Sequence, residues 1–264
     1  MREFRFILAL LTLAAWPHDA GAAPFAVRNG EALSIGYRVW ENESGGSAAG
    51  LTAWNRGEGF ASLGIGHFIW YPTGAQGPFV ESFPRLLEHL EANGVALPDW
   101  LRGGPDCPWP DRSAFHADMD DPRMAELRNL LTRTIDLQAR FMADRLESAL
   151  PRLLESAPAS RRETVARRFH ALASQPQGLY ALIDYVNFKG EGLSATERYR
   201  GRGWGLLQVL LRMREESDGP TALAEFSAAA RRVLNLRVRN SPLERAESRW
   251  LANWRRRVRT YRAA

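Results

Sequence analysis

The 264-residue sequence contains a single cysteine, Cys107. One cysteine excludes an intrachain disulfide, and a chain of this length can bury enough apolar surface to fold without one. No cysteine stands directly after the apolar N-terminal segment, which argues against a lipid-anchored lipoprotein. The core must therefore come from side-chain packing, and a hydrophobic content of 45%, with 9 Trp and 12 Phe, is ample for one globular domain.

Several catalytic signatures are also missing. No H-E-x-x-H pair or histidine–cysteine spacing is present, so we expect no metal site and no cofactor. The sequence has neither a G-x-S-x-G elbow nor a G-x-x-x-x-G-K-[ST] loop. Zinc enzymes, serine hydrolases and phosphate-binding enzymes therefore lack support.

Long apolar runs are confined to the N-terminus. Residues 6–16 are apolar after a basic start, and residues 20–22 are Ala-Gly-Ala, which is typical of a secretory signal with an A-x-A cleavage site. The run is too short for a permanent transmembrane anchor. We expect residues 1–22 to be a cleaved signal peptide, and residues 23–264 to form a single periplasmic or secreted domain of a bacterium.

Positive charge gathers at the C-terminal end. The formal net charge is +5, and residues 221–264 hold eleven arginines against three glutamates. An exported protein meets the anionic cell envelope before it meets nucleic acid, so we expect attraction of the Arg-rich last helix to that envelope and no nucleic-acid partner. The alternative is an ordinary solvated helix face, and we expect a monomer.

Hydrophobic spacing predicts a mainly α fold with one small β-hairpin (α+β). A short helix over 33–43 is stopped by Gly45-Gly46, and a hairpin over 59–70 closes with Tyr71-Pro72. Helices are expected over 83–90, after the cap Asp121-Pro122, over 135–150, after a capping box at 160–163, over 179–188, over 204–213, and from 241 onward with Trp250, Trp254 and Tyr261. The segment 179–188 is apolar nearly all round and should be a buried central helix.

Two carboxylates are the candidate catalytic groups. Glu43 ends the first predicted helix beside aromatic residues, where partial burial would raise its pKa and make it an acid near neutral pH. Glu58 begins the hairpin and would share a strand face with Phe60 and Ser62. Glycoside cleavage uses such a pair, one acid protonating the leaving oxygen and a second carboxylate acting as base or nucleophile. The alternative is that both are solvated surface acids.

The segments "ESGG" (43–46) and "SLGIGH" (62–67) resemble the catalytic region of the lysozyme-like superfamily, which includes phage-type lysozymes and lytic transglycosylases. The resemblance covers residues 33–70 well and 180–210 loosely. It implies that Glu43 is the general acid, that Ser62 orients water, and that Gly64, Gly66 and His67 form the hairpin beside the substrate. Arg56 occupies the usual place of the second acid, so Glu58 fills that role only if the turn is rebuilt.

A Gly-rich stretch near residues 190–205 is flanked by groups suited to polysaccharide binding, namely Asn187, Lys189, Tyr199 and Gln208. Trp204 suits the core equally well. We expect Gly64 and Gly66 to let a sugar chain lie against the backbone, and His67 to act in the hairpin as a hydrogen-bonding residue rather than as a base.

These features together predict an exported enzyme that cleaves the β-1,4 bonds of peptidoglycan. A hydrolase would use Glu43 with Glu58, whereas a lytic transglycosylase would need only Glu43. A chitosanase-like hydrolase of another polysaccharide fits the same fold. A non-catalytic periplasmic module that binds glycan or protein is the alternative from another class.

Overall fold

The computed structural model describes residues 29–77, 79–195, 197–214 and 220–262. Within them the chain is mainly helical with two small antiparallel sheets, so the predicted fold class is confirmed. The expected signal peptide, residues 1–22, lies outside the described part. None of the described helices combines the length and apolar character needed to cross a bilayer.

The helices are α1 (Asn29–Ser44), α2 (Phe83–Ala92), α3 (Arg112–Ala117), α4 (Pro122–Arg133), α5 (Ile135–Ser156), α6 (Arg162–Ala173), α7 (Pro176–Lys189), α8 (Leu206–Arg212), α9 (Pro220–Asn240) and α10 (Leu251–Arg259).

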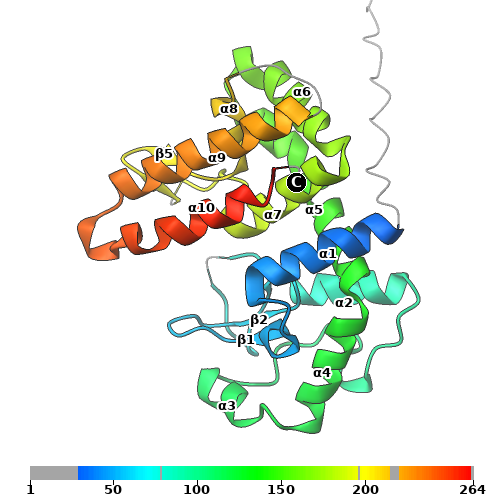
Figure 1. Cartoon of the computed structure of the whole chain (residues 1–264). Coiled ribbons are helices and arrows are strands. Elements are labelled where there is room, and N and C mark those ends of the chain that lie inside the picture. Colours follow the sequence, from blue (N-terminus) through cyan, green and yellow to red (C-terminus); the bar gives the residue numbers. More distant parts are fainter. Residues whose placement is uncertain (1–28, 78, 196, 215–219, 263–264) are drawn as a thin grey trace, which may run out of the picture.

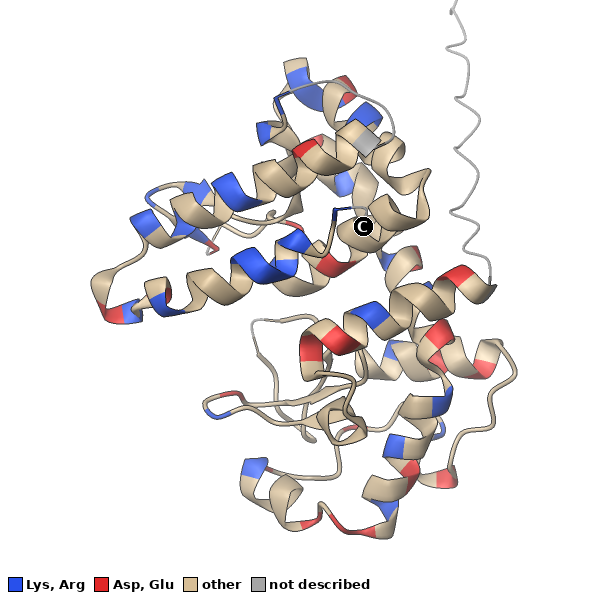
Figure 2. Ribbon diagram, viewed as in Figure 1, with Lys and Arg blue, Asp and Glu red and all other residues tan. Residues whose placement is uncertain are grey.

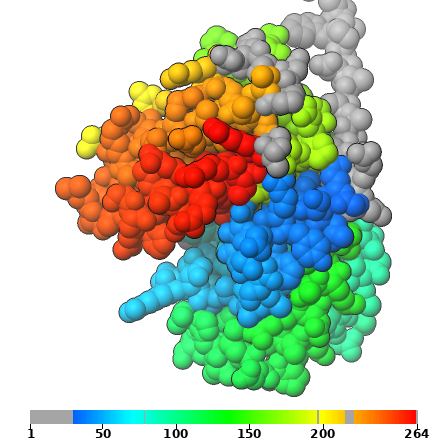
Figure 3. Space-filling view, viewed as in Figure 1, coloured from blue at the N-terminus to red at the C-terminus, as the bar shows by residue number. Residues whose placement is uncertain are grey.

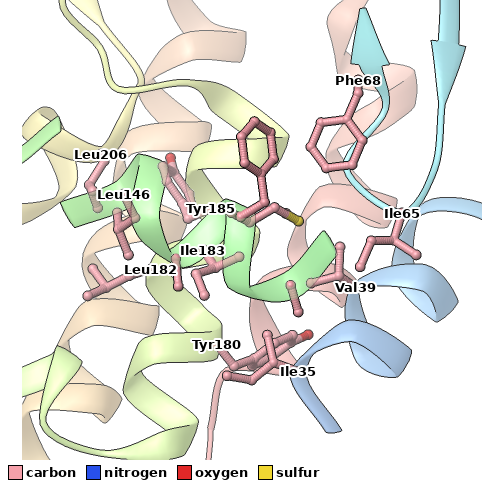
Figure 4. Packing of buried hydrophobic residues seen from close by; sticks show 14 of the residues in the cluster. Ile35, Val39, Ile65, Phe68, Leu146, Tyr180, Leu182, Ile183, Tyr185 and Leu206 are labelled. Carbon is pink, nitrogen blue, oxygen red and sulfur yellow. The ribbon is translucent and has the colours of Figure 1, made fainter. Parts of the chain in front are cut away.

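Two lobes are joined by the long helix α5 (Figure 1). One lobe holds the first sheet and α2–α4, and the other holds α6–α10, while α1 packs on both α5 and α7. The apolar side chains nevertheless form one continuous cluster (Figure 4), in which Ile35 of α1 and Ile65 of the turn between β2 and β3 share a core with Ile183 of α7. A core continuous across both lobes holds residues from distant parts of the chain in fixed relation.

Helix α7 is the central helix that its sequence predicts. Residues 178–185 of α7 are all buried, because the helix contacts α1, α5, α6, α8 and α9. One of the buried residues is an acid, Asp184. A carboxylate at the centre of a helical core must be compensated by charge and hydrogen bonds, and this requirement organises the site described below.

The first sheet has three short strands in the order β1 (Thr52–Ala53), β2 (Ala61–Leu63) and β3 (Phe68–Trp70). Strand β2 begins only at Ala61, so Glu58 lies in the turn between β1 and β2. The prediction that Glu58 shares a strand face with Ser62 is therefore wrong. A second, two-stranded sheet pairs β4 (Arg198–Tyr199) with β5 (Arg202–Gly203).

Gly64 and Gly66 lie in the turn that joins β2 to β3, and internal packing accounts for both glycines. Gly64 has a φ of +67°, and a Cβ there would meet the side-chain oxygen of Gln138 on α5. A Cβ on Gly66 would lie 2.6 Å from the ring of Phe68. The expectation that Gly64 admits a sugar chain is therefore wrong, since a protein side chain occupies that space.

The ends of several helices follow their sequence signals. Gly45 and Gly46, with φ of +63° and +68°, stop α1, and the Asp121 side chain caps α4 by accepting from the N–H of Arg123. The capping box expected at 160–163 does not form, because residues 159–161 make a 3₁₀ turn before α6 and Arg161 carries no side-chain cap.

The last helix begins at Leu251, ten residues later than expected. Two 3₁₀ turns, η4 (Leu243–Arg245) and η5 (Glu247–Trp250), precede it. Ala246 between them has a φ of +46°, a left-handed conformation that a continuous helix cannot accommodate.

Replacing Gly64 by alanine should destabilise the fold by about 1–3 kcal/mol, because alanine would be strained at a positive φ and would press on Gln138. Gly59→Ala is the matched control, since a Cβ there meets nothing within 4 Å. Chemical denaturation of both variants checks this expectation. Equal free energies of unfolding for the two variants would contradict it.

Candidate functional site

Glu43, in the last turn of α1, is surrounded by hydrogen-bond donors from three other parts of the chain. Its side chain is only 12% exposed. Oε1 accepts hydrogen bonds from Asn187 Nδ2 at 2.8 Å and from Arg257 Nη2, and Oε2 lies 3.6 Å from His67 Nδ1. The carboxylate is therefore enclosed by an amide, a guanidinium and an imidazole.

Each donor is delivered by a different element. His67 ends the β2–β3 turn with a φ of +48°, an unusual conformation for a non-glycine residue. Asn187 lies in the last turn of α7 and Arg257 in α10, 144 and 214 residues from Glu43 along the chain. A backbone strained at His67 beside an enclosed carboxylate is a pattern found at functional sites.

Arg257 is held in place by Asp184, whose side chain is fully buried. Arg257 Nε donates to Asp184 Oδ2 and Nη2 donates to Oδ1, each at 2.9 Å. The hydroxyl of Tyr261 donates to Oδ2 at 2.6 Å, and Asn42 Nδ2 donates to Oδ1 at 3.1 Å. Both oxygens of Asp184 are thus satisfied, and the same guanidinium reaches Glu43.

These contacts set the charge state of Glu43. Burial alone would raise its pKa, but the nearby guanidinium of Arg257 and its hydrogen bond, together with His67 and Asn187, bring the pKa below its ordinary value of 4.5. Burial also acts against the charge on Arg257, yet Asp184 and Glu43 raise the pKa of that guanidinium. The expectation of a raised pKa at Glu43 is therefore wrong for this conformation, because an ion pair outweighs the burial.

A pocket of about 170 Å³ lies beside this cluster, lined by Gly66, His67, Ile69, Val80, Ser82, Met142, Arg145, Ile183, Val186 and Asn187. A larger groove of about 800 Å³ shares Val80, Ser82, Arg145 and Val186 with it and extends to residues 190–194 and Glu197. In the space-filling view a recess separates the projecting turn between β1 and β2 from the C-terminal helix α10 (Figure 3). Gly66, His67 and Asn187 therefore line a cavity, as a substrate-binding role requires.

The structure does not bring Glu58 into this cluster. Its carboxylate accepts a hydrogen bond from Asn55 Nδ2 at 3.0 Å, and its backbone carbonyl accepts from Trp54 Nε1 at 2.8 Å, both in the same turn. This turn between β1 and β2 projects from the lobe (Figure 1). Ser62 lies in β2, opposite Ala53 and Ile69, and is 4% exposed. The catalytic roles of Glu58 and Ser62 remain predictions.

The other candidate binding residues make internal contacts in the second lobe. Tyr199 donates to Glu247 at 2.8 Å. Gln208 accepts from the N–H of Gly205 at 2.9 Å and donates to the carbonyl of Gly192 at 3.0 Å. Gln208 thus joins two parts of the Gly-rich stretch, and substrate contact by Tyr199 and Gln208 remains a prediction.

Lys189 lies between two aromatic rings. Its Nζ is 3.8 Å from the ring centroids of both Phe188 and Trp254. Burial, followed by the charges of Arg237 and Arg257, lowers the pKa of Lys189 to about 7. The described contacts of Lys189 are thus internal ones with Phe188 and Trp254. Its contact with a substrate remains a prediction.

Sequence reasoning missed Arg257, Asp184 and Asn42. Asp184 did carry a signal, because an acid inside the apolar segment 179–188 is buried only when it is paired. Arg257 stands in a run of three arginines, and no local pattern separates it from Arg255 and Arg256. In the described part of the chain, no group of three or more His, Cys, Asp or Glu side chains is placed to hold a metal ion.

Comparisons of the chain with protein-family models, with curated proteins and with solved structures find no match.

The lowered pKa of Glu43 makes its contribution to stability dependent on pH. The ionised carboxylate should stabilise the fold fully above its ordinary pKa of 4.5, and this contribution should disappear as pH falls through the lower folded-state pKa. Glu43→Gln should therefore cost about 1.5–3 kcal/mol at neutral pH, the range for a hydrogen bond to a charged group. The cost should shrink below pH 4.5.

Denaturation of the wild type and Glu43→Gln across pH measures this difference. Glu41→Gln, at an exposed position on the same helix, is the control. A destabilisation by Glu43→Gln that does not change with pH would show that the ion pair with Arg257 is not its cause.

Proposed function

We propose that this chain is an exported enzyme that cleaves the β-1,4 bonds of peptidoglycan, with Glu43 as its catalytic acid. The proposal depends on one observation: a glutamate at a helix end is enclosed by side chains from three other parts of the chain, and two of these side chains, His67 and Asn187, line a pocket. Glycoside cleavage needs such an enclosed carboxyl to protonate the leaving oxygen. The resemblance of segments 43–46 and 62–67 to the lysozyme-like superfamily supports the same reaction.

The acid role requires that Glu43 gain a proton, although Arg257 favours its ionised form. Arg257 makes two hydrogen bonds to Asp184, so its position does not depend on Glu43. If the Glu43 side chain rotates away from Arg257 toward a bound sugar, burial becomes the main influence and raises its pKa. On this mechanism, substrate binding and acidic conditions both favour the protonated acid.

The site favours a route with one catalytic carboxylate. Hydrolysis with two carboxylates places them about 5–9.5 Å apart across the scissile bond. Glu58 instead makes its side-chain hydrogen bond inside its own projecting turn. Glu43 acting first as acid and then as base, with a hydroxyl of the sugar as nucleophile, needs no second carboxylate and corresponds to lytic transglycosylation.

A second candidate function is a non-catalytic glycan-binding module. The ion pair between Glu43 and Arg257 favours it, because a carboxylate locked in its ionised form cannot donate a proton. Such a module would bind glycan in the same pocket without cleaving it.

Glu43→Gln should reduce glycan cleavage by about 10²–10⁴-fold, since the amide keeps the shape of the side chain but has no acidic proton. Turnover of purified sacculi and thermal melting should be measured together, with Glu41→Gln as the control. Mass spectrometry of the products separates the two routes, because anhydro ends lack the water present in reducing ends. Cleavage at the wild-type rate by a folded Glu43→Gln variant would exclude the acid role, and glycan binding without cleavage by the wild type would favour the module.

Arg257→Gln should raise the pKa of Glu43, because burial then acts without its strongest opposing charge. The pH range of glycan cleavage should extend to higher pH, since Glu43 keeps its proton there. Arg255→Gln is the matched control, because Arg255 contacts Asn235 rather than the site.

Melting curves should accompany these rates, because Arg257→Gln also leaves Asp184 without its cation. Arg257→Lys retains a positive charge beside both acids and should shift the profile less. A pH profile unchanged in both folded variants would argue against control of Glu43 by Arg257.

A further inference from the structure

The connection between α9 and α10, residues 241–250, carries the most exposed large apolar side chain of the described residues. Leu243 is 95% exposed, and Trp250 at the other end of the connection is 46% exposed. Figure 1 shows α9 and α10 as a helical hairpin that projects from the body, with this connection at its tip. Both side chains are therefore presented to the surroundings at an extremity of the molecule.

An ion pair and a hydrogen bond hold the connection in place. Arg237 on α9 donates to both carboxylate oxygens of Glu247, at 2.8 and 2.7 Å, and Tyr199 donates to the same carboxylate at 2.8 Å. Glu247 is buried, and the guanidinium of Arg237 stacks 4.0 Å over the ring of Trp204. The exposure of Leu243 thus belongs to an anchored element rather than to a frayed end.

Positive charge predominates around the two apolar side chains, and the one exposed acid of the connection is Glu244, next to Leu243. Arg239, Arg245 and Arg249 are exposed, and the guanidinium of Arg249 lies 5.1 Å from the ring of Trp250. Basic residues mark both helices of the projecting hairpin in Figure 2. Arg257 of α10 pairs internally with Glu43 and Asp184, so it does not contribute to the exposed positive charge. That charge lies beside the apolar side chains of the tip.

We propose that the 241–250 connection docks on an anionic lipid bilayer. Leu243 enters the acyl boundary, Trp250 lies at headgroup level, and Arg239, Arg245 and Arg249 contact lipid phosphates. Apolar insertion combined with a basic cluster is a known basis for reversible membrane binding, and Trp favours the membrane–water interface. This inference concerns the location of the protein and does not depend on the proposed function.

A lipid surface fits this tip better than a protein partner does. A stable protein interface buries about 800 Å² on each side and has a packed apolar centre. The tip offers two separate apolar side chains on a convex extremity, which a deformable bilayer can enclose without a preformed complementary pocket.

A fluorophore placed at the tip tests the proposal in the full chain. Cys107 is only 2% exposed, so an environment-sensitive thiol dye labels an introduced cysteine selectively. Leu243→Cys carries the dye at the tip, and Leu33→Cys on α1, a 42% exposed leucine, is the control. With vesicles of equal parts phosphatidylglycerol and phosphatidylcholine, the dye at 243 should shift to the blue and the dye at 33 should not.

The local readout separates the tip from every other region, because the two labelled proteins differ only in the position of the dye. No shift at 243 while the protein co-sediments with vesicles would overturn the proposal, because another region would then be the docking surface. An equal shift with pure phosphatidylcholine would overturn the requirement for anionic lipid, and absence of any vesicle binding would overturn docking itself.

Affinity measurements on unlabelled variants provide an independent test. Leu243→Asp should weaken binding to the mixed vesicles by about tenfold or more, as expected from losing the burial of one leucine side chain, whereas Leu33→Asp should not. Replacing Arg239, Arg245 and Arg249 by glutamine should weaken binding and reduce its dependence on salt. Binding lost in the arginine variant but unchanged in Leu243→Asp would identify a general polyanion site and overturn the lipid proposal.

Discussion

The arrangement of the site depends on the need to compensate one buried carboxylate. Asp184 is inside the helical core, where an unpaired ion costs several kcal/mol. Its oxygens accept from Arg257 and Tyr261 near the C-terminus and from Asn42 on α1. Two segments distant in sequence, α1 and residues 257–261, are thereby held against α7, and the guanidinium that compensates Asp184 also reaches Glu43. A structural requirement of the core therefore determines the charge environment of the candidate catalytic residue.

A second constraint positions the other side of the site. Gln138 of α5, which is fully buried, accepts from the N–H of Ile65 at 3.0 Å and donates to the carbonyl of Leu131 at 2.6 Å. This amide fixes the β2–β3 turn to the helix that joins the lobes. Gly64 is needed because Gln138 approaches it closely, and His67 at the end of the same turn is held beside Glu43. The same central framework, α5 and α7, thus orients both the imidazole and the guanidinium.

The electrostatics of Glu43 connect these constraints to the proposed reaction. Burial favours a neutral carboxyl, and Arg257 favours a charged one. In the proposed reaction, the distance from Glu43 to one guanidinium nitrogen of Arg257 therefore controls whether Glu43 is protonated and can act as an acid. Arg257 makes two hydrogen bonds to Asp184 besides its contact with Glu43, so the proposed mechanism needs a change of side-chain rotamer at Glu43 and no repacking of the core.

The sequence by itself determined most of the secondary structure and one end of the site. Hydrophobic spacing predicts α5 and the buried helix α7, and glycines predict the end of α1, because these signals are local. Glu43 is predicted from its place at a helix end, His67 from a motif resemblance and Asn187 from its residue type beside the Gly-rich stretch. Only the tertiary structure decided that Glu58 lies in a projecting turn, that Gly64 accommodates Gln138, and that Arg257 rather than its neighbours pairs with Glu43. These outcomes depend on contacts between residues far apart in the chain, which no local periodicity encodes, and the sign of the pKa shift at Glu43 follows from one such contact.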